Sequence, residues 1–479
     1  MWKNKPLGGL TLLVGMAMVL AYAPFGLWFL GAASLAWLYV LVVRAAGWRQ
    51  LVGACALWGF GWQIACLHWL PRSFYIDAGR DVGAAVFGGI PALVVVCIWG
   101  LAGVVVAGAA TYKVKNHAGR GGVFISIWLG VEVVRSLSPF GFPWLLLGAA
   151  VSGWPVLAQA AAGPWGVFGL SFMVLALAVL GAEGVMAGRG KHQKVWYGAA
   201  LGLFVVWSGF GVWRLAGAPA VSASQGALLR LVQPNIQDPL KWDIEARWGF
   251  VAQTADMMKT PGWPLVDAFI LPENALPLDV ERETAAVDML RHGLGKNQQV
   301  VAGTVGRDEQ KDGSWQYTNR IVVLGENGVE SQSDKVLLVP FGEYIPLRSL
   351  IMVLPLPAPL KTFLQGRTDY TAAQAPALLT IGGQKALPLV CYEGIFMPYV
   401  KQHAQNADFL LNLTSDMWFT GTIALSQHAA LARLRAIENH MPLVRVATTG
   451  ITVVYDAYGR EVFKLSTDQI ITADYQLKN

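Results

Sequence analysis

Long apolar runs in the first half of the chain constrain its fold more than any other feature. Each run is near or above the roughly 20 residues that a helix needs to cross the hydrocarbon core of a membrane. Apolar residues make up 54% of the 479-residue sequence and charged residues only 14%, which is typical of a membrane protein. The runs are residues 7–22, 27–43, 51–70, 84–110, 122–138, 164–186 and 195–216. We therefore expect an α-helical transmembrane bundle of about seven spans over residues 1–217.

The charges between these runs predict the orientation of the helices. Residues 1–220 carry 14 Lys and Arg against 4 Asp and Glu, a net charge of +10, whereas the remainder is net −4. Basic charge can indicate nucleic-acid binding, but here it lies in every second short loop, and basic loops stay cytoplasmic. A cleaved signal peptide is a rival interpretation of the first run, but that run continues into a second span without a clear cleavage site. We expect a cytoplasmic N-terminus, an exported domain after about residue 217, and no nucleic-acid partner.

Residues 218–479 have the pattern of a layered α/β domain. Short β-branched runs alternate with polar-faced segments of helical spacing. The strand-like runs are Ala227–Val232, Val266–Leu271, Val300–Val305, Arg320–Leu324, Ala386–Val390, Phe409–Leu413 and Leu443–Ala447, and the helical segments are Trp242–Met257, Glu281–His292 and Leu425–Asn439. The stretch Val339–Leu360 is rich in Pro and Leu without a regular period, which predicts a long functional loop.

The cysteines narrow the chemistry of the exported domain. No His pair has metal-ligand spacing, and the sequence contains neither a G-x-S-x-G elbow nor a P-loop, so we expect no metal site. Cys55, Cys66 and Cys97 fall in apolar runs, where a small buried side chain explains them. Cys391 is the only cysteine in the exported domain, and a lone thiol there is either buried filler or a nucleophile.

The position of Cys391 favours a nucleophile. It ends an apolar strand and precedes a predicted helix, whose N-terminus would help to stabilise a thiolate. Glu273 also directly follows a predicted strand, and sites gather outside the carboxyl ends of strands in open α/β sheets. Lys335 and Glu343 flank a third apolar run. Taken singly, Glu273 would be a solvated loop carboxylate and Lys335 a surface residue.

Together, these segments resemble the Glu-Lys-Cys constellation of the nitrilase superfamily. They read Pro-Glu-Asn around Glu273, Lys-x-x-Leu-Val-Pro-Phe-Gly-Glu-Tyr from Lys335, and Cys-Tyr-Glu from Cys391. With the preceding spans, the chain resembles the apolipoprotein N-acyltransferase family as far as about residue 475. Two features depart from that family: the sequence ends in polar residues 474–479 where a further membrane helix is usual, and it has Ser415-Asp-Met-Trp418 where Asn-Asp-Ala-Trp-Phe is frequent.

The resemblance implies an αββα nitrilase-like sandwich over residues 218–479 and a set of residue roles. Glu273 would be the general base, Lys335 and the backbone N–H of Tyr392 would stabilise the oxyanion, and Cys391 would carry a thioester. The supporting residues would be Glu343, Tyr392 and Glu393, and the substrate contacts Trp242, Tyr344 and Trp418.

The resemblance also implies the substrates and the setting. The acyl donor would be a phospholipid and the acceptor the N-terminal amine of the S-diacylglyceryl cysteine of an apolipoprotein, with no cofactor. The enzyme would be a multi-pass, monomeric protein of the bacterial inner membrane with a periplasmic catalytic domain.

Two other interpretations stay open at this point. The same triad would serve a membrane-tethered carbon–nitrogen hydrolase that cleaves a nitrile or an amide with water as second nucleophile, although one span would be enough to tether it. Alternatively, the spans form a transporter and the outer domain regulates it, which requires polar residues inside the spans. His68, Glu132 and Arg135 are the candidates for that role.

The predicted topology can be tested with reporter fusions. A reporter fused after Gly217 should be exported, and one fused after Arg189 should stay in the cytoplasm, because basic loops alternate with uncharged ones. Paired fusions to alkaline phosphatase, active only outside, and to a fluorescent protein that folds only inside measure this. If both positions report the same side, the predicted number of spans is wrong.

Overall fold

A computed structural model describes residues 8–77, 82–137, 141–219, 226–236, 244–353, 355, 361, 364–365 and 368–477. The chain forms two compact units. The first contains the chain up to Pro71, Gly89–Ala218 and Ser426–Glu438, and the second contains Arg72–Gly88, Pro219–Leu425 and the chain from Asn439 on. Each unit therefore takes one short segment from the other half of the sequence.

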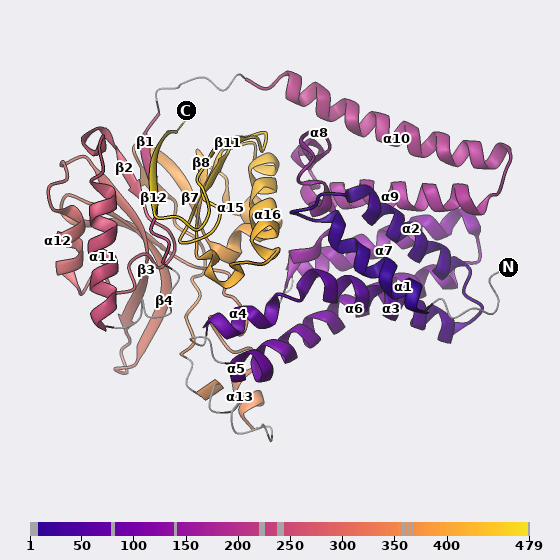
Figure 1. Ribbon diagram of the computed structural model, residues 1–479, viewed down its shortest axis with the longest axis horizontal. Coiled ribbons are helices and arrows are strands. Elements are labelled where there is room, and N and C mark those ends of the chain that lie inside the picture. The colour runs from indigo at the N-terminus through magenta and orange to yellow at the C-terminus, as the bar shows by residue number, and fades with distance from the viewer. Residues whose placement is uncertain are drawn as a thin grey trace. The chain divides into compact units, whose positions relative to one another are not determined.

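The first unit is built from apolar helices (Figure 1). Its α-helices include α1 (Gly8–Met16), α2 (Trp28–Val43), α3 (Trp48–Leu67), α6 (Ile90–Lys113), α7 (His117–Leu137), α9 (Gly166–Met186) and α10 (Lys191–Ala216). Among the described residues, four helical segments are long and apolar enough to cross a membrane: Trp48–Ile76, Ile90–Lys113, Gly166–Met186 and Lys191–Ala216. Gly8–Ala21 and Trp28–Val43 are shorter apolar helices, so the number of about seven spans stays a prediction.

Small residues allow the first helices to pack closely. A Cβ at Gly15 of α1 would lie 2.1 Å from the carbonyl oxygen of Trp58 in α3, and one at Gly61 of α3 would lie 2.4 Å from that of Leu12. Only a glycine fits where two helix backbones approach this closely, as is usual for helices packed inside a membrane.

Residues 143–162 run in short turns instead of a continuous helix, and polar side chains satisfy their backbone. The turns are η3 (Pro143–Leu145), η4 (Leu147–Val151), α8 (Pro155–Ala158) and η5 (Gln159–Ala162). Glu132 accepts a hydrogen bond from the N–H of Leu147 at 2.8 Å, and Arg135 donates one to the carbonyl of Phe142 at 3.0 Å. Irregular backbone in an apolar setting requires such partners. Two of the three polar residues that the transporter interpretation needs therefore have a structural use.

The second unit is a sandwich of two six-stranded sheets (Figure 1). The first sheet has the order β12-β1-β2-β3-β4-β5, and the second β11-β10-β9-β8-β7-β6. Strands β1, β2 and β3 are parallel, as are β7, β8 and β9, and the flanking pairs are antiparallel. The bounds are β1 Leu228–Gln233, β2 Ala268–Ile270, β3 Gln299–Glu309, β4 Trp315–Gly325, β5 Gly328–Asp334, β6 Leu379–Ile381, β7 Gln384–Val390, β8 Phe409–Thr414, β9 Leu443–Ala447, β10 Val453–Tyr455, β11 Glu461–Lys464 and β12 Ile471–Gln476.

Both faces of the strands β1 and β2 are buried, which explains why these strands are almost continuously apolar. In β1, Leu229 and Leu231 point into the core between the sheets, where they join Leu411 and Val444 of the second sheet. Residues of the opposite face form a second core with the helices α11 (Ile244–Met258) and α12 (Thr284–Arg291). The predicted fold class, a helical membrane bundle with an α/β sandwich, is confirmed.

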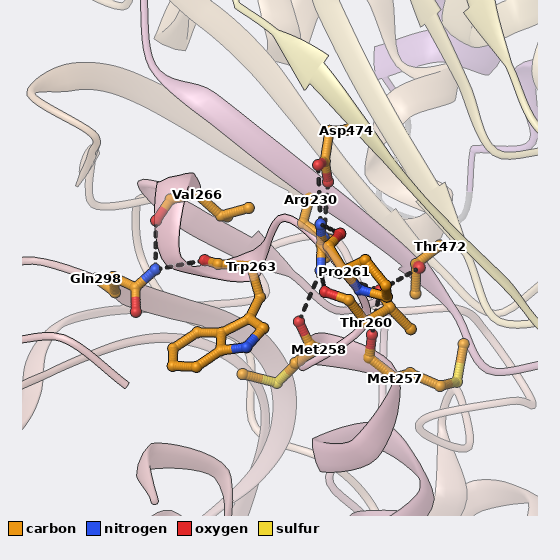
Figure 2. A network of polar contacts seen from close by, with 10 residues as sticks. All are labelled: Arg230, Met257, Met258, Thr260, Pro261, Trp263, Val266, Gln298, Thr472 and Asp474. Carbon is orange, nitrogen blue, oxygen red and sulfur yellow. Dashed lines mark hydrogen bonds and ion pairs between the residues drawn. The ribbon is translucent and has the colours of Figure 1, made fainter. Parts of the chain in front are cut away.

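An ion pair between the buried Arg230 and the exposed Asp474 fastens the last strand, β12, to β1 (Figure 2). Arg230 of β1 donates to both carboxylate oxygens of Asp474 at 2.7 and 2.8 Å. The same guanidinium donates to the carbonyls of Met258, Thr260 and Pro261, which follow α11. One side chain thus joins β1, β12 and the end of α11, and its charge is fully paired.

Candidate active site

Cys391 stands at a sharp turn directly after β7. Its backbone is in the left-handed region (φ 48°), and it begins the 3₁₀ turn η8 (Cys391–Ile395). Glu393 closes this turn, because its carboxylate accepts a hydrogen bond from the N–H of Val390 at 2.7 Å. A non-glycine residue keeps such a conformation only where its surroundings enforce it, which is common at functional sites.

Glu273 lies three residues after β2 and is held through both oxygens of its buried carboxylate. Oε1 accepts a hydrogen bond from Nδ2 of Asn319 at 2.8 Å, and Oε2 accepts one from the backbone N–H of Ser415 at 2.7 Å. Gly303 of β3 makes the close approach to this segment possible, since a Cβ there would lie 2.6 Å from the Cα of Glu273. The carboxylate is therefore fixed from both sheets.

Lys335 follows β5 and is paired with Glu343. Its Nζ donates to Oε1 of Glu343 at 2.8 Å, and its side chain is only 1% exposed. The Asn319 amide donates to the same oxygen of Glu343 at 2.9 Å, so one Nδ2 group bridges Glu343 and Glu273. The second oxygen of Glu343 accepts a hydrogen bond from the N–H of Val339 at 2.8 Å.

The charges of this cluster keep Cys391 in its thiol form. Burial raises the pKa of Cys391, and the negative charge of Glu273 raises it further, against a smaller opposite effect of Lys335. Burial lowers the pKa of Lys335, but Glu343, Glu273 and Cys391 together raise it above its usual value, so Lys335 stays charged. The expectation that a helix N-terminus stabilises a thiolate is wrong, because a five-residue 3₁₀ turn follows Cys391 and burial dominates.

Glu393 connects the Lys335 segment to the Cys391 turn. Its Oε1 accepts hydrogen bonds from the N–H groups of Val336 at 2.7 Å and Leu337 at 3.1 Å, and from the hydroxyl of Tyr399 at 3.2 Å. Burial raises the pKa of Glu393. The carboxylate therefore acts as a structural bridge, and the predicted supporting residues Glu343 and Glu393 both lie in the cluster with Glu273, Lys335 and Cys391.

The structure describes two of the three predicted substrate contacts, Tyr344 and Trp418. Tyr344 is half-buried one residue beyond Glu343, and its carbonyl accepts a hydrogen bond from the N–H of Phe341 at 2.7 Å. Trp418 is half-buried in η9 (Asp416–Phe419), and its carbonyl accepts one from the hydroxyl of Ser73 at 3.0 Å. Ser73 belongs to α4 (Leu70–Asp77), which brings a segment from between the membrane helices into the catalytic unit. Trp242 lies outside the described residues.

Sequence reasoning missed Asn319 and the backbone N–H of Ser415, the two groups that hold Glu273. Asn319 lies inside β4, one residue before the predicted strand Arg320–Leu324. A polar amide entering an apolar strand was the available signal, since a buried amide needs partners. The Ser415 N–H carries no side-chain signal, because any residue except proline could supply it.

Comparison with known proteins agrees with this geometry. The carbon–nitrogen hydrolase family matches residues 228–479, and the N-terminal domain of apolipoprotein N-acyltransferase matches residues 14–180. An apolipoprotein N-acyltransferase of Brucella melitensis is 31% identical over 442 residues, which cover 90% of this chain and 80% of that protein. Proteins of the same name from Brucella suis and Sinorhizobium medicae are 30% and 31% identical over 97% and 93% of this chain, and the matches cover 88% and 85% of those proteins.

The fold and the site define a membrane protein that carries a carbon–nitrogen hydrolase domain. More particularly, the chain belongs to the apolipoprotein N-acyltransferase family. It is therefore an acyltransferase, and the resemblance found in its motifs is confirmed.

Replacing Gly303 with alanine should displace Glu273 and strongly lower the rate of acyl transfer. The new Cβ would meet the backbone of Glu273 and Asn274 at 2.6–2.7 Å, which cannot be relieved by a rotamer change. We expect acyl transfer per folded molecule to fall by about 100-fold, since misplacement of a reacting group by about 1 Å has that effect. Transfer assays on membranes with matched protein levels measure it. Gly249→Ala, on an open face of α11, is the control and should keep full activity; equal activity of both variants would contradict this account of the site.

Proposed function

We propose that this protein transfers an acyl chain from a phospholipid to the α-amino group of the S-diacylglyceryl cysteine of an apolipoprotein, through a thioester on Cys391. The observation that carries the proposal is the convergence of Cys391, Glu273 and Lys335 in a chain with apolar membrane helices. These groups follow β7, β2 and β5, and they influence one another's charge. A buried thiol, a carboxylate and an ammonium group are the set required for covalent acyl transfer.

In the first half-reaction, Glu273 takes the proton of the Cys391 thiol as the sulfur attacks the ester carbonyl of the phospholipid. The carbonyl oxygen becomes an oxyanion, which the Lys335 ammonium and the backbone N–H of Tyr392 stabilise. The ester C–O bond then breaks, and the leaving oxygen takes the proton from Glu273. The products are a lysophospholipid and an acyl thioester on Cys391.

In the second half-reaction, the acceptor amine attacks the thioester carbon. Glu273 takes the amine proton, the C–S bond breaks, and Glu273 gives that proton to the Cys391 sulfur. The product is an amide, and the enzyme returns to its thiol form. The raised pKa of Cys391 supports this cycle, because a thiol that stays protonated needs a base for its attack on the ester.

The pairing of charges supports different roles for the two carboxylates. Glu343 shares its Oε1 with the ammonium of Lys335 and its Oε2 with a backbone N–H, so its charge is largely neutralised. Glu273 accepts hydrogen bonds only from a neutral amide and a backbone N–H among the contacts of its carboxylate. Of the two, Glu273 is therefore the better base, while Glu343 orients Lys335.

The proposed setting follows from the substrates. Both substrates hold acyl chains in a membrane, which fits a chain with several apolar helices. We place the catalytic domain on the periplasmic face of the bacterial inner membrane, on the basis of the alternating basic loops. The enzyme would act as a monomer, with Trp242, Tyr344 and Trp418 at the lipid entrance.

An adduct assay tests the proposal. The purified protein, incubated with a phospholipid labelled in its acyl chain, should retain the label in a form that hydroxylamine releases, because hydroxylamine cleaves thioesters. Cys391→Ala should retain none while staying folded and membrane-inserted, since the loss of one sulfur atom costs little packing. Cys391→Ser should show little or no turnover, because Glu273 is too weak a base to activate a hydroxyl.

The control for this assay is the triple variant Cys55→Ala, Cys66→Ala, Cys97→Ala. Those thiols lie buried in α3 and α6, so the variant should label normally. Normal transfer by Cys391→Ala would rule out the covalent mechanism. Labelling by an amide or a nitrile, with no labelling by phospholipid, would favour the carbon–nitrogen hydrolase instead.

A further inference from the structure

A fully buried ion pair lies within electrostatic reach of Cys391. The carboxylate of Asp416, in η9, accepts hydrogen bonds from Nη2 and Nη1 of Arg445 in β9, at 2.7 and 2.8 Å. Both side chains are 0% exposed. A paired arrangement of this kind satisfies two charges, but burial of the pair contributes little net stability compared with an apolar pair of the same volume. Its presence therefore calls for an explanation other than stability.

The pair has almost no freedom to move. Asp416 also accepts a hydrogen bond from the N–H of Ile451 at 3.2 Å, and Arg445 donates to the carbonyl of the same residue at 2.6 Å. A Cβ at Gly450 would lie 2.1 Å from the Asp416 carboxylate, so the chain at Gly450 presses against it. The beginning of η9 is thus fixed from two directions.

The residue before Asp416 supplies one of the two hydrogen bonds to the proposed base. The N–H of Ser415 donates to Oε2 of Glu273 at 2.7 Å. The peptide that carries this N–H joins Thr414, at the end of β8, to Ser415, and the next residue is the immobilised Asp416. The hydroxyl of Ser415 also accepts a hydrogen bond from Thr448 at 3.2 Å. A shift of Asp416 would therefore tilt the N–H away from Glu273.

We infer that Asp416 and Arg445 are positioning residues for acyl transfer, which aim the Ser415 N–H at Glu273 and so hold that carboxylate in place to take the Cys391 proton. Neither residue touches a reacting atom in this account. The inference rests on the proposed function of Glu273 and adds to it the device that keeps the base competent. It gives the Ser-Asp-Met-Trp segment, which the triad alone does not use, a part in the reaction.

The test replaces the pair with uncharged side chains of similar size, Asp416→Asn with Arg445→Met, in the full-length protein. A control exists in the same domain, namely Asp474→Asn with Arg230→Met, because that pair is also a two-point Arg–Asp contact, although its carboxylate is 33% exposed (Figure 2). The measurement is the rate of thioester formation from labelled phospholipid as a function of phospholipid concentration. Thermal unfolding of each variant accompanies it.

We expect the Asp416/Arg445 variant to form the thioester about 10- to 100-fold more slowly at neutral pH, the effect of losing one hydrogen bond to a charged group. The half-saturating phospholipid concentration should stay within about 2-fold, since the pair does not touch lipid. The control variant should lower thermal stability and leave the rate of thioester formation unchanged.

Arg445→Lys is a second variant that keeps the buried charges balanced but gives up the two-point geometry. It should show a smaller rate loss. An unchanged rate, a half-saturating phospholipid concentration that rises by as large a factor as the rate falls, or unfolding of both variants while the control pair folds would each overturn the inference. Failure of the wild-type protein to form any hydroxylamine-labile adduct would instead overturn the proposed function.

Discussion

The buried ammonium group of Lys335 carries one positive charge and lies near two carboxylates, so it cannot neutralise both. It is hydrogen-bonded to Glu343 and within electrostatic reach of Glu273, and both carboxylates also share the amide of Asn319. Buried charges are tolerated only with partners in fixed positions, so the ends of β2 and β5 must meet the middle of β4 with little error. Burial raises the pKa of the Cys391 thiol, and the negative charge of Glu273 raises it further, so the thiol stays protonated.

The rest of the catalytic unit provides the rigidity that this cluster demands. Gly303 lets β3 approach the Glu273 segment, Glu393 ties the turn at Cys391 to the residues after Lys335, and the Asp416–Arg445 pair fixes η9. These contacts join segments about 30 to 60 residues apart in sequence, and the one from Glu393 to Val336 crosses from one sheet to the other. A sandwich with two buried faces on its central strands supplies such contacts, whereas a site carried on exposed loops would not.

Much of this could be predicted from sequence, and the reasons for the failures are physical. The strands β1, β7, β8 and β9 were predicted to within about two residues because they are buried and largely apolar. The polar strand β5 and the edge strands β6, β11 and β12 were not, because partly exposed antiparallel strands carry no long apolar run, and β10 was missed because it is only three residues long. The sequence also predicted that Glu273, Lys335 and Cys391 act together, because motifs carry side-chain signals; the structure brings them into one cluster, and their catalytic roles stay a proposal. Asn319 and the Ser415 N–H were not predicted, because their function depends on contacts across the sandwich.

The account's central claim is that one thioester serves two unlike substrates, and the fate of a preformed thioester tests it most directly. Protein labelled with an acyl group on Cys391 would be freed of phospholipid and then mixed with a synthetic S-diacylglyceryl cysteine peptide. A peptide with a free α-amino group should take up the label as an amide, and the N-acetylated peptide should leave it on the protein. Release of the label as free fatty acid, at a rate that does not depend on either peptide, would contradict the account and identify water as the second substrate.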